Sequence, residues 1–318
     1  MNMKIFHVIP ALCVCITALL SFPPESAALD QQDESRRGFY FGMQTGVSLP
    51  GEYESTRTNT RSVPTNCDQW LPGEILNDGT PVPLPLSECS PRLFPGSPNG
   101  FDLGKGILAG VQAGYALGAL RIEVEYFRRG QRGAFLPLVI PGDAKQAEFV
   151  ERSEKISDFR TDNLFANLYY DFRGMLSPNA TPYLGVGAGL AQQKLFYSAV
   201  SVRTNDRDRM RQLGRNSHAA GLASLADAKL SDRIFSFQFL AGVDYAVDER
   251  FSAGLKLRYG SVGEFLDGEN PWRLLRGHES TVGPTSGTGY DMPIQYEIKG
   301  NPSHFWGISL GLRYHIGG

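Results

Sequence analysis

Ile234–Tyr259 reads IFSFQFLAGVDYAVDERFSAGLKLRY, two runs in which apolar residues alternate with small or polar ones. Apolar side chains occupy every second position from Phe235 to Val247, and again from Phe251 to Tyr259. Successive side chains of a β-strand point to opposite faces, so each run predicts a strand with one apolar face. The polar residues 248–250 between the runs predict a tight turn, which makes the pair an antiparallel hairpin.

Both predicted strands are longer than the usual ~5–6 residues of a soluble sheet, and they match the ~9–11 tilted residues that cross a bilayer. Their second face alternates glycine with charged residues, as at Gly254, Lys256 and Arg258. Such a face is typical of a narrow lumen, so the hairpin is predicted to belong to the wall of a membrane-spanning barrel.

The composition agrees with a chain built mainly of strands. The 318 residues include 36 glycines, 19 phenylalanines and 13 tyrosines, and the length allows one to three domains. The formal net charge is only -2, whereas a nucleic-acid-binding protein is usually strongly basic. We therefore expect no nucleic-acid partner.

Residues 1–28 are predicted to be a secretory signal peptide. Lys4 precedes an apolar run over residues 5–22, and Ser26–Ala28 supplies a small-residue cleavage site. An uncleaved membrane anchor is the alternative, and a lipoprotein is disfavoured because Cys13 and Cys15 lie inside the apolar run. No other apolar run approaches the ~18 residues of a membrane helix. Residues 29–318 are therefore expected to be exported as one barrel domain, because a closed barrel is the other way to span a membrane.

Two cysteines remain after the signal, Cys67 and Cys89. An exported chain meets an oxidising compartment, so one disulfide between them is predicted. Two free thiols are the alternative, and the spacing is wrong for a Cys-x-x-Cys metal or redox pair.

Six further runs show the same alternation as the first two. The eight predicted strands span residues 38–49, 107–117, 120–126, 163–172, 183–191, 235–247, 251–259 and 305–316. A single alternating run says little, but eight in one exported chain strongly indicate an outer-membrane barrel.

The connections between these strands alternate strictly between short and long. Short connections fall at residues 118–119, 173–180 and 248–250. Long connections fall at residues 50–105, 130–162, 192–233 and 260–304. The pattern predicts an all-β, eight-stranded antiparallel transmembrane β-barrel with short periplasmic turns, four long extracellular loops and both ends in the periplasm. A soluble sandwich or lipocalin is the alternative, but it gives no reason to separate the loops by length.

Three stretches carry a resemblance to a known superfamily: NLFANLYYDF at 163–172, TPYLGVGAGLA at 181–191 and GVDYAVD at 242–248. The chain resembles the eight-stranded outer-membrane β-barrels, which include the OmpA membrane domain, the neisserial opacity proteins and the rickettsial surface antigens of the porin family. The resemblance implies a location in the outer membrane and insertion by the barrel-assembly machinery. Tyr314–Gly318 departs from the terminal aromatic residue of these families, and no peptidoglycan-binding domain follows the last strand.

Four acidic and four basic residues occupy lumen-facing positions of the predicted strands. They are Arg121, Glu123, Glu125, Asp171, Asp244, Lys256, Arg258 and Arg313. Buried charges need partners, so this lumen charge network is predicted to form ion pairs. Two interpretations are open, a gated pore or proton path and a packed polar plug. The small lumen of eight strands favours the plug.

The sequence predicts no enzyme, no catalytic residue, no cofactor and no metal site. A catalytic site on a small barrel would need a nucleophile beside a base. His218 and His278 fall in long connections, His315 points into the lumen, and Ser303–His304 are only neighbours in sequence at a strand edge. A lipid-modifying enzyme remains as a distant alternative.

Two features of the third long connection stand out. Arg203–Arg215 reads RTNDRDRMRQLGR and would suit contacts with lipopolysaccharide phosphates, although a solvated loop face is the plainer interpretation. Ser217–Leu230 reads SHAAGLASLADAKL, a composition that predicts a short helix.

Two classes of function follow from this sequence. The first is a structural or surface-exposed interaction scaffold, adhesin- or antigen-like, because loops held by a rigid framework are where binding usually occurs. The alternative is a narrow porin-like channel for ions or small solutes. The expected partners are outer-membrane lipid, lipopolysaccharide, the barrel-assembly machinery and a surface ligand or protein bound through the long loops.

Overall fold

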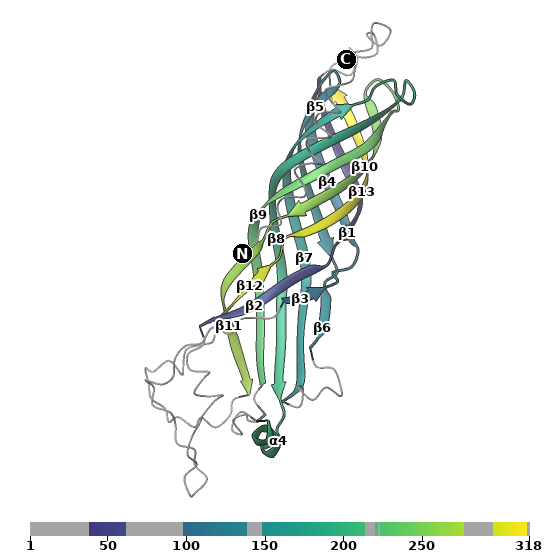
Figure 1. The fold of residues 1–318 in the computed structure, drawn as a ribbon. Coiled ribbons are helices and arrows are strands. Elements are labelled where there is room, and N and C mark those ends of the chain that lie inside the picture. The colour runs from purple at the N-terminus through teal and green to yellow at the C-terminus, as the bar shows by residue number, and fades with distance from the viewer. Residues whose placement is uncertain are drawn as a thin grey trace, which may run out of the picture.

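The computed structural model describes residues 38–61, 98–138, 148–213, 220–221, 223–276 and 295–316. Eight long antiparallel strands form its framework (Figure 1). They are β1 (Gly38–Pro50), β4 (Gly106–Leu117), β5 (Leu120–Gln131), β7 (Phe149–Asp171), β8 (Ala180–Arg203), β9 (Ala223–Ala246), β10 (Phe251–Val262) and β13 (Ser303–Ile316). They are hydrogen-bonded in the order β10-β13-β1-β4-β5-β7-β8-β9, and β9 pairs again with β10. This closed ring confirms the predicted eight-stranded barrel.

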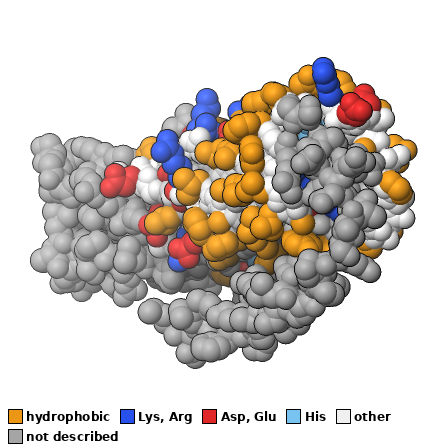
Figure 2. Space-filling view, turned by 90° about the horizontal axis from the view of Figure 1, so that it is seen from above, with side chains coloured by type: hydrophobic (Ala, Val, Ile, Leu, Met, Phe, Trp, Pro, Cys, Tyr) orange, Lys and Arg blue, Asp and Glu red, His pale blue; other side chains and the backbone are white. Residues whose placement is uncertain are grey.

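The outer face of the ring is apolar over the span next to the short turns. Ile107, Leu310 and Met43 are 72%, 66% and 64% exposed, and large apolar side chains alternate with buried ones along every strand. Figure 2 shows hydrophobic side chains over much of the barrel end turned toward the viewer. A continuous apolar surface of this size is not stable in water, so the ring has the surface of a barrel surrounded by lipid.

Aromatic side chains mark both edges of this apolar belt. Near the turns, the rings of Phe39 and Tyr115 pack with their centroids 4.8 Å apart, and Phe251 packs on Tyr314. At the opposite edge, Tyr259 packs on Trp306. Aromatic residues prefer the two membrane–water interfaces, so these contacts mark the limits of the membrane-spanning segments.

Beyond the membrane-spanning part, longer barrel strands and added strands prolong the wall of the barrel, and this part is here called the extension. The parts of β7, β8 and β9 farthest from the short turns project past the outer aromatic edge, and further strands pair beside them in the order β6-β7-β8-β9-β11-β12-β2-β3. The added strands are β2 (Tyr53–Arg61), β3 (Pro98–Phe101), β6 (Ala134–Pro137), β11 (Phe265–Arg276) and β12 (Gln295–Gly300). Much of what the sequence predicts as loop is therefore sheet.

The helix predicted over residues 217–230 is wrong. Ala223–Leu230 forms the first part of β9 and pairs with Leu195–Val202 of β8. The helix α4 (Arg207–Gln212) lies instead at the far tip of the extension, with Asp206 as its N-cap (Figure 1). An Ala- and Leu-rich composition favours a helix only weakly, and pairing with a neighbouring strand overrides it.

Some predictions concern residues outside the described ranges. These are the signal peptide at residues 1–28, the bridge between Cys67 and Cys89, and the ending at Gly317–Gly318. Among the residues that are described, no helix is both long and apolar enough to cross a membrane.

Candidate functional site

The interior of the membrane-spanning barrel holds two layers of paired charges. In the layer nearer the turns, Arg121 contacts Asp171 at 2.8 Å and Asp244 at 3.1 Å. Arg313 contacts the same Asp244 oxygen at 2.5 Å. The Arg121 guanidinium also lies 4.8 Å from the ring centre of Tyr183, where it gains a cation–π contact. The layer alternates bases and acids across several strands.

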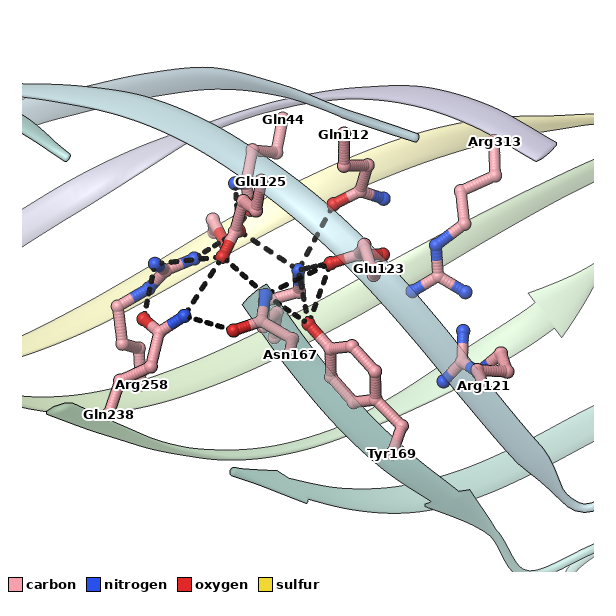
Figure 3. Close-up of polar contacts among 12 residues, drawn as sticks. Gln44, Gln112, Arg121, Glu123, Glu125, Asn167, Tyr169, Gln238, Arg258 and Arg313 are labelled. Atoms are coloured by element: carbon pink, nitrogen blue, oxygen red, sulfur yellow. Dashed lines mark hydrogen bonds and ion pairs between the residues drawn. The ribbon is translucent and has the colours of Figure 1, made fainter. Parts of the chain in front are cut away.

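Glu125 is the centre of the second layer and is fully buried. Its carboxylate accepts hydrogen bonds from Arg258 at 2.5 Å and from Lys256 at 3.1 Å (Figure 3). The side-chain amides of Asn167 and Gln238 donate to it at 2.9 and 3.1 Å. The Gln44 amide also donates to Glu125. A buried carboxylate is stable only when its oxygens are satisfied in this way.

Glu123 shares the same layer and is bound by neutral donors as well as by a base. The hydroxyls of Tyr169 and Tyr40 donate to its carboxylate at 2.7 and 3.0 Å. Lys256 lies 3.4 Å from one of its oxygens. Lys256 therefore bridges Glu123 and Glu125, and its ammonium also donates to Gln112 at 3.0 Å. The two acids and the bridging base form one connected network (Figure 3).

An aromatic layer covers this network on the side of the extension. The Arg258 guanidinium lies 3.8 Å from the ring centre of Phe127, which stacks on Phe165 and contacts Phe305. A contiguous apolar core continues into the extension. Its buried members include Tyr53, Phe101, Phe159, Leu195, Tyr197, Leu230, Phe265, Tyr296 and Ile298. The lumen is thus filled by a polar plug in the membrane-spanning part and by apolar side chains in the extension.

Polar contacts also fasten the added strands to the extension. Arg57 of β2 pairs with Glu154 of β7 at 2.9 Å and donates to the Tyr197 hydroxyl at 3.0 Å. Asn99 of β3 donates to Glu154 at 3.0 Å. Burial raises the pKa of the Tyr197 phenol, so this hydroxyl stays neutral and keeps its hydrogen-bonding role at physiological pH.

The structure brings all eight charged residues selected from the sequence into these two layers. Every one is less than 9% exposed. The neutral partners of these charges were not among the residues predicted from the sequence, although their lumen-facing positions follow from the same alternation. These partners are Tyr40, Gln44, Gln112, Asn167, Tyr169 and Gln238. No group of three or more potential metal ligands occurs within the described ranges.

Arg129 is a ninth charged residue inside the barrel and was missed. It is 4% exposed, and its guanidinium lies 3.6 Å from the ring centre of Phe305. Among the described residues it has no ion pair with a carboxylate, and its Nε has no hydrogen-bond partner. The predicted strand ended at Tyr126, whereas β5 continues to Gln131 with the same alternation. Continuing the predicted alternation past Tyr126 would have placed Arg129 on the lumen-facing side of the strand.

The two histidines nearest the barrel make local contacts. The His315 ring lies inside, with Nε2 3.2 Å from the Ser252 hydroxyl, and its ring packs against Tyr40. The His304 ring stacks on Tyr259 at the outer aromatic edge. These contacts assign neither ring a chemical role.

No protein-family model matches the chain, and no curated protein matches it either. Similar solved structures include neisserial surface protein A, at 15% identity over 88% of this chain and 97% of that one, with a TM-score of 0.39. The outer membrane protein OprG from Pseudomonas aeruginosa is 10% identical over 88% of this chain and 98% of that one, with a TM-score of 0.40. These similarities are too weak to assign a function.

The prediction that the protein is not an enzyme is corrected by the same comparison. The outer membrane protease OmpT from Escherichia coli is 8% identical over 86% of this chain and 97% of that one, with a TM-score of 0.34. A barrel at the outer membrane can therefore carry catalysis, and the fold alone gives no ground for denying it. The similarity is too low to transfer any catalytic residue to this chain.

The chain has the fold of an outer-membrane β-barrel. The strand register closes the ring, the apolar belt faces outward between two aromatic edges, and short turns lie at one end with long connections at the other. This combination is the architecture of barrels in that membrane.

Proposed function

We propose that the protein is a closed outer-membrane scaffold that presents its extension as a surface for binding. The observation that carries the proposal is the filled lumen. At membrane depth, buried acids and bases pair with one another, and beyond them the interior is an apolar core. A conducting pore needs a continuous polar path with sites that ions can leave, and the part of the interior formed by the described residues offers neither.

The extension suits a binding role because it is a rigid support. Its added strands are hydrogen-bonded to the barrel strands and share one buried core with them. Residues 62–97 join β2 to β3 and residues 277–294 join β11 to β12, so both of these long connections start and end on the extension. Connecting segments held by a rigid framework are the usual place for recognition.

Purified protein in planar bilayers is expected to give no steady channel conductance. The reason is that an ion would have to break the Glu125–Arg258 pair and then cross the Phe127–Phe305 layer. A general porin inserted in the same bilayers is the control for reconstitution. A large, steady conductance from the wild-type protein would contradict the scaffold and favour the narrow channel, with the same charged residues lining it.

A short epitope placed after Gln212, beside helix α4, is expected to be accessible to antibody on intact cells. The same epitope placed in the turn Asp248–Arg250 should be recognised only after the outer membrane is permeabilised. The two sites lie at opposite ends of the molecule (Figure 1). Whole-cell antibody binding with and without permeabilisation measures both. Recognition of the turn epitope alone on intact cells would contradict the proposed orientation.

A further inference from the structure

A group of basic side chains projects outward from β5, β7, β8 and β9 just beyond the apolar belt. We call Arg128, Arg160, Lys194 and Arg233 the basic row. Arg160 and Lys194 are direct partners in the β7–β8 ladder. Arg128 and Arg233 belong to the neighbouring line of the sheet, which runs through Asp162 and Gln192. The strand pairing therefore places the four cations side by side on one wall.

The depth of the basic row is fixed by the apolar residues next to it on the same strands. Tyr126, Leu164, Leu190 and Phe235 are 39–54% exposed on the outer face, two to four residues nearer the turns. At about 3.3 Å per residue, the cations lie roughly 7–13 Å along the strands from these apolar side chains. The basic row is therefore at the level of lipid headgroups when the apolar belt is in the membrane.

Local acids neutralise only part of this charge. Arg128 pairs with Asp162 at 2.6 Å. Arg160 lies 3.9 Å from Asp158, and the side chains of Arg160 and Asp158 are both largely exposed. In the described part of the chain, Lys194 and Arg233 form no ion pair with a carboxylate. The wall formed by β10 and β13 has a different chemistry at its outer edge, where Tyr259, His304 and Trp306 pack together. The positive charge is thus concentrated on one side of the barrel.

We propose that the basic row binds the phosphate groups of lipopolysaccharide in the outer leaflet. Arginine offers paired donors that match phosphate oxygens, and lysine adds a compact positive charge. The acyl chains of the same lipid would pack on the apolar belt directly below. The proposal does not depend on whether the lumen conducts.

The basic row replaces the segment that the sequence suggested for this contact. In Arg203–Arg215, Arg203 pairs with Glu148 at 2.9 Å and Arg211 pairs with Asp208 at 2.6 Å. Helix α4 lies at the far tip of the extension, away from the apolar belt (Figure 1). Its arginines are too far from the membrane surface to meet the phosphates of a lipid headgroup.

The test measures binding of lipid A to the full chain in detergent, with lipid A carrying both phosphates and with lipid A from which the phosphates were removed. The variant Arg160→Gln/Lys194→Gln/Arg233→Gln is expected to lose about tenfold or more in affinity for the phosphorylated lipid. The matched control is Arg211→Gln/Arg250→Gln/Lys299→Gln, which removes the same charge from exposed positions elsewhere and should change the affinity less than about twofold.

Two results would overturn the proposal. One is an equal loss of affinity in both triple variants, which would show that only net charge matters. The other is equal binding of the two lipids to the wild-type protein, which would assign binding to the apolar belt alone and needs no variant to interpret. Heat-modifiable migration on gels, measured without lipid A, shows whether each variant is folded. Added salt should weaken the binding of the phosphorylated lipid to the wild type, and should leave the binding of the lipid without phosphates unchanged.

Discussion

Replacing Glu125 with glutamine is expected to lower the free energy of unfolding by about 3–5 kcal/mol. The amide keeps the shape of the side chain but removes the charge that Arg258 and Lys256 both contact. Two buried cations would then share Glu123, whose ion pair in the wild type is with Lys256. Equilibrium unfolding in urea, with the barrel in lipid vesicles and tryptophan fluorescence as the signal, measures the change.

Four further variants separate the effect of pairing from that of burial. Arg258→Met should cost about as much as Glu125→Gln, and the double variant should cost less than the sum of the two, because the residues interact directly. Arg129→Met should be neutral or stabilising, since this buried cation has no carboxylate partner among the described residues. Glu249→Gln, in an exposed turn, should change stability by less than about 0.5 kcal/mol. Equal costs for Glu125→Gln and Glu249→Gln would contradict the role of the network.

The membrane-spanning part of the fold could be predicted because lipid imposes a simple rule on the sequence. Lipid requires apolar residues at every second position, as at Phe235, Phe237 and Phe239, and the narrow lumen requires small or polar residues between them. The same rule located the eight lumen charges. It could not pair them, because partners such as Glu125 and Arg258 come from strands on different sides of the ring.

The extension was not predicted because its pattern is inverted. Beyond the outer aromatic edge the strands face water outside and a core inside, so Leu195 and Tyr197 are buried while Lys194 is exposed. In β7 the alternation also shifts by one residue at a bulge between Ser157 and Arg160, where Asp158 has a φ of 50°. A prediction based on outward-facing apolar residues therefore ends each strand at this boundary and assigns the residues beyond it to loops.

Gly46 of β1 is expected to tolerate no side chain at all. A Cβ there would lie 2.0 Å from the carbonyl oxygen of Ile308 and 2.6 Å from the Cα of Ser309, both backbone atoms of β13. No side-chain rotation relieves such a contact, so Gly46→Ala would force β1 and β13 apart where they close the ring. The expected cost is about 3 kcal/mol or more.

Gly311→Ala is the matched comparison in the facing strand. Its Cβ would lie 3.4 Å from the nearest backbone oxygen, an ordinary contact, so this variant should fold and unfold like the wild type. Heat-modifiable migration and urea unfolding of the two variants measure the difference. If Gly46→Ala proved as stable as Gly311→Ala, the close approach of β1 to β13 would be contradicted. The expected contrast instead means that closure of the barrel depends on backbone contact at Gly46, where the side-chain network can offer no compensation.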